Sequence, residues 1–263
     1  MNDFGFCPLF FLTILYALSK DFLVICCKIN RNKSEKGMKS LFFANFASCK
    51  VEMMKKNIYK KFDKKKISAL PRVLFEGRII TILTPEETDK AVDYLLAKPI
   101  LGIDTETRPS FKRGVIHKVS LLQVSTTDTC FLFRLNYTNL TPALIRLLED
   151  EKVPKVGLSL NDDIRSLKGR RAFKPGFFID LQNNVSKIGI EDMSLQKLYA
   201  NLMGQRISKA QQLSNWDVDV LNEKQKRYAA TDAWACIMLY EELSRLMESG
   251  NFILVEAKKD VDQ

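Results

Sequence analysis

Residues 221–246, LNEKQKRYAATDAWACIMLYEELSRL, repeat apolar side chains at helical spacing and contain no Pro or Gly. The pattern predicts one long helix. Residues four apart lie on the same face of a helix, with β-carbons about 5–6 Å apart. Tyr228 and Asp232 have this spacing and can therefore meet in one small site. The spacing is also common by chance, and alone it fits a half-buried core tyrosine and a solvated aspartate better than it fits a site.

A second pair of acids closes the apolar stretch Pro99-Ile-Leu-Gly-Ile-Asp104-Thr-Glu106. The stretch predicts a buried central strand. Residues two apart in a strand point to the same face, so Asp104 and Glu106 should lie side by side at the strand's end. Unpaired charge is costly in such a place, and a divalent cation offsets it. An all-oxygen cluster favours Mg²⁺ or Mn²⁺.

A third acidic segment is Lys155-Val-Gly157-Leu-Ser-Leu160-Asn-Asp-Asp163-Ile-Arg-Ser-Leu167. It predicts a short strand followed by a helix whose first turn is acidic, which the helix dipole favours. Acidic residues are good helix starters without any catalytic role. The pattern itself does not choose between Asp162 and Asp163.

These three stretches resemble motifs I, II and III of the DEDD-type 3′–5′ exonucleases, tyrosine subclass, in order and spacing. The resemblance runs from about Arg78 to about Leu246, and it is closer to the Werner-syndrome exonuclease domain than to ribonuclease D. The family's motif II aspartate lies six residues after the glycine, which selects Asp163. The chain departs from the Werner-type pattern after that aspartate, at Ile164-Arg165. Further similar stretches are Val119–Val124, Gln212–Trp216 and Leu221–Tyr228.

The resemblance implies a ribonuclease-H-like α/β fold and removal of nucleotides from a free 3′ end of nucleic acid. It implies that Asp104, Glu106 and Asp232 hold one divalent ion, and that Asp104 and Asp163 hold a second. In the two-metal mechanism these Mg²⁺ or Mn²⁺ ions assist phosphodiester hydrolysis, and Tyr228 positions the attacking water. No small-molecule cofactor is expected. We favour DNA as substrate and DNA repair as the setting; an RNA-trimming enzyme of the ribonuclease D type and a non-catalytic nucleic-acid-binding module are the alternatives.

Substrate contacts are expected around the unpaired 3′-terminal nucleotide, where apolar and aromatic side chains stack on bases. Phe111 lies beside two cations, and Trp216 could stack in the same way or pack against the final helix. Gln123 is expected to have a strand-pairing or core role. The expected contacts are Thr105, Phe111, Lys112, Arg113 and Trp216.

Patterns along the rest of the chain predict a mixed sheet flanked by helices on both faces, because three strands in a run precede a helix–strand alternation. The expected strands are 78–83, 99–104, 117–124, 130–135, 155–158 and 177–180. The expected helices are 85–97, 141–149, 162–167, 194–202 and 221–247.

Composition limits the other chemistry. The formal net charge is +10, but residues 1–66 hold 14 of the 41 Lys and Arg and only 5 of the 31 acids, so the remainder is nearly neutral. The six cysteines form no C-x-x-C pair, which argues against a zinc or disulfide framework. His117 is the only histidine, and the residue five before Asp232 is Arg227, which excludes the family's histidine subclass.

The expected domain order is an N-terminal extension (1–53), a basic linker (54–77), the exonuclease domain (78–250) and a C-terminal tail (251–263). The apolar run 4–29 is interrupted by Lys20-Asp21, and neither half reaches the roughly 20 residues of a membrane helix. We therefore expect a start codon assigned too far upstream, with Met38, Met53 or Met54 as the initiator, and a cytoplasmic protein. The alternative is a weak membrane anchor at 4–29.

Overall fold

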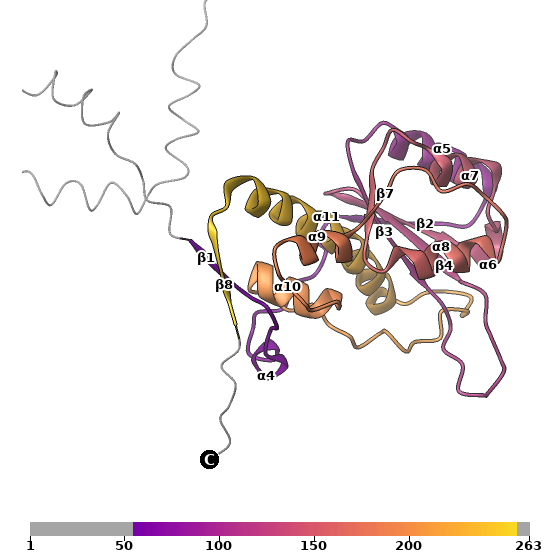
Figure 1. Cartoon of the computed structure of the whole chain (residues 1–263). Helices are drawn as coiled ribbons and strands as arrows, with labels where there is room; N and C mark the ends of the chain where they lie inside the picture. The colour runs from indigo at the N-terminus through magenta and orange to yellow at the C-terminus, as the bar shows by residue number, and fades with distance from the viewer. Residues whose placement is uncertain (1–54, 257–263) are drawn as a thin grey trace, which may run out of the picture. The chain divides into compact units, whose positions relative to one another are not determined.

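The computed structural model describes residues 55–256, and its centre is a six-stranded sheet in the order β2-β5-β4-β3-β6-β7 (Figure 1). Strand β4 is antiparallel to β3 and β5, and the other neighbouring pairs are parallel. The α/β class and the mixed sheet are thus confirmed. The strands are β2 (Arg78–Ile82), β3 (Leu101–Glu106), β4 (Leu121–Ser125), β5 (Thr129–Arg134), β6 (Lys155–Gly157) and β7 (Phe178–Asp180).

Helices cover both faces of the sheet. The helices that pack on one face are α5 (Pro85–Leu96), α7 (Pro142–Glu149) and α8 (Leu160–Lys168), with the short α6 (Leu135–Thr138) at the end of β5. The other side carries α9 (Leu181–Lys187), α10 (Leu195–Met203) and the long α11 (Glu223–Ser249). Asn222 and Gln225 form a capping box that fixes where α11 begins.

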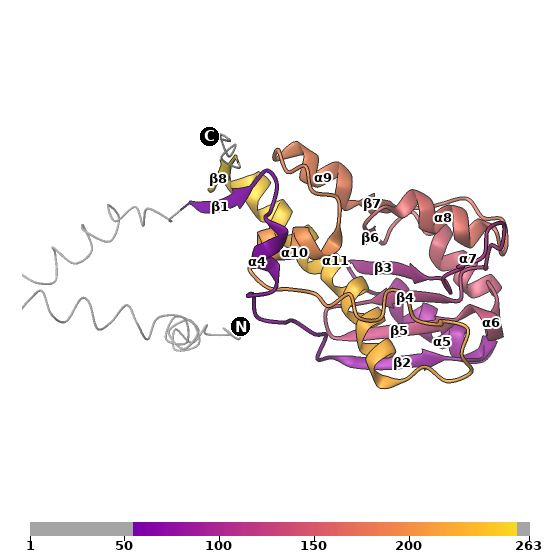
Figure 2. The ribbon, with the colours of Figure 1, turned by 90° about the horizontal axis from the view of Figure 1, so that it is seen from below.

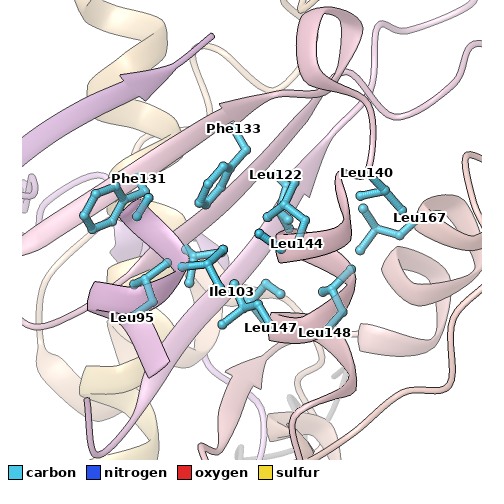
Figure 3. Packing of buried hydrophobic residues seen from close by; sticks show 14 of the residues in the cluster. Leu95, Ile103, Leu122, Phe131, Phe133, Leu140, Leu144, Leu147, Leu148 and Leu167 are labelled. Atoms are coloured by element: carbon cyan, nitrogen blue, oxygen red, sulfur yellow. The ribbon is translucent and has the colours of Figure 1, made fainter. Parts of the chain in front are cut away.

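The face under α5 and α7 carries an apolar core (Figure 3). Strand alternation points Ile103, Leu122 and Val124 to this face, where they meet Leu95 of α5 and Leu147 of α7. All five side chains are at most 2% exposed. This apolar layer packs the sheet against α5 and α7 and fixes the position of β3.

Helix α11 crosses β3, β4 and β5 on the opposite face (Figure 2). The crossing is so close that a β-carbon on Gly102 would lie 1.9 Å from the carbonyl oxygen of Ala233. Only glycine permits this approach. Because Asp104 follows Gly102 by two residues and Asp232 precedes Ala233, the contact brings the two acids together.

The chain segments on either side of the expected domain also belong to the fold. Strand β1 (Lys56–Tyr59) pairs in parallel with β8 (Phe252–Val255), and the side-chain amide of Asn201 bonds both the N–H and the carbonyl of Tyr59. Ile58 is fully buried, and helix α4 (Lys64–Ile67) follows it. The small sheet therefore contains Lys56–Tyr59 of the expected linker and Phe252–Val255 of the expected tail, and it packs against α10 and α11.

The apolar run 4–29 and the candidate start residues lie outside the described residues. Among residues 55–256, no helix combines the length and apolar character needed to cross a membrane.

Candidate active site

Three carboxylates converge where β3 ends beneath α11. One carboxylate oxygen from each of Asp104, Glu106 and Asp232 lies within 4.8 Å of the others. The first two share a strand face because they are two residues apart, and the third reaches them through the Gly102–Ala233 contact. Glu106 and Asp232 are buried, and Asp104 is partly buried.

Asp163 lies beside this cluster and is hydrogen-bonded to strand β3, which carries Asp104 and Glu106. Its carboxylate accepts a hydrogen bond from the hydroxyl of Thr105. Helix α8 starts early, at Leu160, because Ser159 adopts a left-handed conformation (φ 62°) and the Asp180 carboxylate accepts the N–H groups of both residues.

The neighbouring Asp162 is exposed and pairs with Arg165 on the surface. The structure thus places Asp163, and not Asp162, at the site. The Thr105 hydroxyl donates to Asp163 and so supports that carboxylate, and Thr105 also lines the pocket beside the acids. Its expected substrate contact stays a prediction.

The electrostatics of the cluster require a counter-charge. Burial, followed by repulsion from the other carboxylates, raises the pKa of Glu106 to about 10, and the same two effects raise the pKa of Asp104 well above its usual value. Burial raises the pKa of Asp232 to about 7 and that of Asp163 to about 6. Four such groups cannot all ionise near neutral pH without a cation. Among the described residues, the buried Oδ1 of Asp232 has no hydrogen-bond partner, and an all-oxygen donor set of this kind fits Mg²⁺ or Mn²⁺.

Tyr228 lies one helical turn before Asp232 and lines the same pocket. Burial and the carboxylates of Asp232 and Glu106 raise the pKa of its hydroxyl, so the phenol stays protonated at neutral pH. Its ring packs against Trp216, with centroids 6.1 Å apart. The hydroxyl is thus a fixed hydrogen-bond donor at the edge of the cluster.

The pocket beside the acids has a volume of about 290 Å³. Its opposite wall comes from the start of α10, at Ser194 and Gln196, and from the loop that follows α10, at Ser208, Lys209 and Gln212. Lys209 lines the same pocket as Asp232, and its positive charge partly offsets the rise in the pKa of that carboxyl group.

Sequence reasoning did not identify Lys209 or Gln196. A lone lysine in a polar loop has no distinguishing local pattern, and only its position just before the family-like stretch Gln212–Trp216 could have drawn attention to it.

Trp216 is not a substrate-stacking residue in this structure. It is fully buried and packs with Leu121, Leu132 and the Tyr228 ring. Trp216 instead packs against the final helix, α11, which was the alternative expectation.

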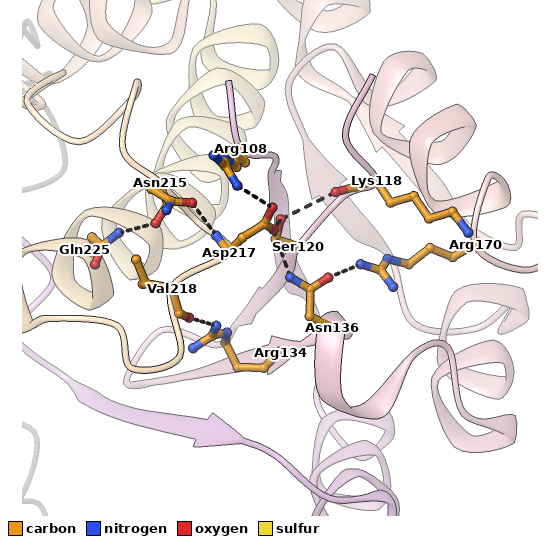
Figure 4. Close-up of polar contacts among 10 residues, drawn as sticks. All are labelled: Arg108, Lys118, Ser120, Arg134, Asn136, Arg170, Asn215, Asp217, Val218 and Gln225. Atoms are coloured by element: carbon orange, nitrogen blue, oxygen red, sulfur yellow. Dashed lines mark hydrogen bonds and ion pairs between the residues drawn. The ribbon is translucent and has the colours of Figure 1, made fainter. Parts of the chain in front are cut away.

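The loop that carries Trp216 is held by polar contacts to the sheet (Figure 4). Asp217 accepts hydrogen bonds from the Ser120 hydroxyl and the Asn136 amide, and Arg134 donates to the carbonyl of Val218. At the other end, the Gln225 amide donates to the carbonyl of Asn215. These bonds fix Trp216 beneath Tyr228, so the network indirectly sets the position of the tyrosine ring.

Phe111, Lys112 and Arg113 lie in the long loop between β3 and β4, outside the pocket lining. Phe111 is 86% exposed, and Ile116 on the same loop is 93% exposed. The loop leaves the sheet directly after Glu106, so these side chains border the site without lining it.

Buried carboxylates at the end of a central strand, facing a helix-borne acid and tyrosine, define a hydrolase site of the ribonuclease-H-like type. Residues 79–248 match the sequence model of the 3′–5′ exonuclease domain. The match covers well over half of the chain, and the chain belongs to the 3′–5′ exonuclease family.

Curated relatives agree with this assignment. The chain is 30% identical over 169 residues to the bifunctional 3′–5′ exonuclease/ATP-dependent helicase WRN of Mus musculus, a match that covers 62% of this chain and 12% of that protein. It is 29% identical over 209 residues to a 3′–5′ exonuclease of Arabidopsis thaliana, with 73% of each protein covered.

Solved structures share the fold. The Nibbler EXO domain of Aedes aegypti aligns with a TM-score of 0.60 and 21% identity over 67% of this chain and 92% of that one. Escherichia coli RNase D aligns with a TM-score of 0.59 and 20% identity over 66% of this chain and 46% of that one. The protein is a 3′–5′ exonuclease, a hydrolase that acts on nucleic acid.

Proposed function

We propose that this exonuclease shortens DNA from its 3′ end with the help of two divalent ions. The observation that carries the proposal is the set of three carboxylates within 4.8 Å, with Asp163 tied to the same strand through Thr105. Asp104, Glu106 and Asp232 would hold one ion, and Asp104 and Asp163 the other. When bound, such ions lower the pKa of a water molecule and offset charge on the scissile phosphate.

Tyr228 orients the attacking water in this scheme. Its raised pKa keeps the proton on the phenol, so the hydroxyl donates a hydrogen bond and does not act as a general base. The Trp216 ring beneath it limits its rotation, which keeps the donor aimed at the acids.

Lys209 contributes the positive charge of the opposite wall. Its charge partly offsets the rise in the pKa of Asp232, and it lines the pocket that a terminal nucleotide would enter. We propose that it binds a non-bridging phosphate oxygen, as a lysine does as a point charge. Lys209→Met should weaken DNA binding and raise KM more than it lowers kcat. Lys152→Met, which removes the same charge from an exposed position outside the pocket lining, is the matched control.

The loop 107–118 would contact the strand beyond the terminal nucleotide. It contains four Lys or Arg, one His and no acid, and the exposed side chains of Phe111 and Ile116 lie among these cations. Basic residues neutralise phosphates and make binding salt-dependent. Replacing Lys112 and Arg113 by Ala should therefore reduce the salt dependence of DNA binding.

The preference for DNA is supported by the relative that is 30% identical, a WRN exonuclease–helicase. The test is digestion of 3′-end-labelled and 5′-end-labelled DNA and RNA, as single strands, blunt duplexes and recessed duplexes, with Mg²⁺ or Mn²⁺. We expect stepwise shortening from the 3′ end, faster on DNA, and none with Asp163→Asn. Faster cleavage of RNA would replace DNA by the exoribonuclease alternative, and full activity in EDTA would contradict the metal proposal. DNA repair and a cytoplasmic location remain predictions.

A further inference from the structure

Gln123 lies in the middle of β4 and is fully buried. Neither its side-chain nitrogen nor its side-chain oxygen has a hydrogen-bond partner among the described residues. A buried amide without partners is costly, because the hydrogen bonds it made to water are lost and nothing replaces them. Such a group needs an explanation, and it points to a partner within reach.

The sheet register places Gln123 directly opposite Asp104. The two residues are paired in the antiparallel ladder of β3 and β4, so their side chains lie on the same face, with β-carbons about 4.5–5.5 Å apart. On its other side Gln123 is paired with Leu132 of β5. Leu121, Leu132 and Trp216 form an apolar cluster there. The indole N–H of Trp216 is also buried without a partner among the described residues, and because it is a donor it can serve only the amide oxygen of Gln123. For the amide N–H groups, the sheet register offers the Asp104 carboxylate as acceptor, although the two side chains are not hydrogen-bonded in this structure.

A purely structural role leaves the amide nitrogen of Gln123 without an explanation. Strand β4 is central, and the backbone groups around Gln123 are already used in the ladders with β3 and β5. Helix α11 covers this part of the sheet with backbone groups that are paired within the helix. An apolar side chain of similar length would pack here at no polar cost.

We propose that Gln123 is a positioning residue for the exonuclease reaction: in the metal-loaded protein its side-chain N–H would donate to the Asp104 carboxylate and fix the rotation of that metal ligand. The inference rests on the proposed metal-binding role of Asp104. Carboxylates that bind metal are themselves held by hydrogen bonds, and loss of such a partner lowers metal affinity or activity by about 10–100-fold. The buried amide of Gln123 therefore lowers the stability of the metal-free protein, and it prearranges the Asp104 carboxylate for metal binding.

The test replaces Gln123 by Met, which keeps the length of the side chain and removes both polar atoms. Three quantities are measured: the urea midpoint in EDTA, the rise in Tm on titration with Mn²⁺, and the Mn²⁺ concentration that gives half-maximal exonuclease rate. We expect Q123M to be at least as stable as wild type in EDTA and to need about 10–100-fold more Mn²⁺ in the other two measurements. Leu132→Met, on the same row of the sheet, is the control and should change neither Mn²⁺ requirement.

A merely structural amide would give the opposite pattern, with lower stability in EDTA and an unchanged Mn²⁺ requirement, and this would overturn the proposal. If Q123M does not fold, Gln123→Asn serves instead, because it keeps the amide but shortens its reach and should still raise the Mn²⁺ requirement. If the Tm and activity of the wild-type protein do not depend on Mn²⁺, the metal proposal itself is contradicted. This outcome is distinguishable from a failure of the Gln123 proposal alone.

Discussion

On the face of the sheet under α5 and α7, Ile103 and Leu122 point into an apolar core (Figure 3), whereas under α11 the same two strands present Asp104 and Gln123. The first face buries side chains that gain free energy on leaving water. The second buries carboxylates whose pKa values are raised by burial and by each other. Because strand residues alternate, one strand can serve stability with every second residue and chemistry with the others.

The largest effect is expected on the acidic face, from Asp104→Asn. Asp104 is the carboxylate that both proposed ions share, so its loss should lower kcat by about 10³-fold or more, roughly 4 kcal/mol of transition-state stabilisation. Removing one charge from the crowded cluster should leave the metal-free protein as stable as wild type, or more so. Single-turnover rates and urea unfolding in EDTA measure the two quantities.

The matched change is Asp162→Asn, one residue before the fourth acid. Asp162 is exposed and pairs only with Arg165 among the described residues, so its loss should leave the rate nearly unchanged. A large loss with Asp162→Asn and none with Asp163→Asn would reverse the assignment of the fourth ligand.

Tyr228→Phe should have the next largest effect. The change removes only the hydroxyl and keeps the ring that packs on Trp216. A positioned proton-handling group contributes about 10²–10⁴-fold, so we expect a loss of kcat in that range. The Mn²⁺-dependent rise in Tm should persist, since the acids are intact. Unchanged turnover would remove Tyr228 from the mechanism.

On the apolar face, Leu147→Ala should act on stability alone. Leu147 is fully buried in the core shown in Figure 3, and a leucine-to-alanine change in a core costs about 2–5 kcal/mol. Urea unfolding should show this loss, while kcat per folded molecule at low temperature stays at the wild-type value. A fall in kcat at constant fold content would mean that the two faces are coupled through β3.

The sequence predicted the elements whose pattern is long and local. Helix α11 was found because its periodicity runs without Pro or Gly inside the element, and strand β3 because a short apolar run there ends in two acids. Strands β1 and β8 were missed because each has four residues, β1 begins within a lysine-rich stretch, and their pairing joins the two ends of the described chain. A contact over that sequence distance leaves no local pattern.

The site residues also divide into those that a local pattern identifies and those that only long-range contacts place. The acids and Tyr228 were identified from motif spacing, which depends only on local periodicity and on resemblance to a family. The burial of Trp216 and the approach of Lys209 depend on how the loop between α10 and α11 folds back on the sheet. That path is set by polar contacts such as Ser120 to Asp217, nearly a hundred residues apart in sequence, which no short pattern contains.

The effect that should vanish at acidic pH, and the sharpest test of the difference between the faces, is the pH dependence of Glu106→Gln. Burial, and next the charge of Asp104, raises the pKa of Glu106 from 4.5 to about 10 in the folded protein. As pH rises from about 4 to 9, this group ionises in the unfolded chain while the folded protein keeps it protonated, so the metal-free wild type loses stability relative to the variant. Below the unfolded pKa the group is neutral in both states and the difference vanishes. Urea midpoints in EDTA should therefore be nearly equal at about pH 4 and favour Glu106→Gln at about pH 8.5, and Mn²⁺ should reverse the order by stabilising the wild type more. Leu147→Ala should show a constant offset at both pH values, and a constant offset for Glu106→Gln would mean that the acidic face does not carry the electrostatic cost inferred for it.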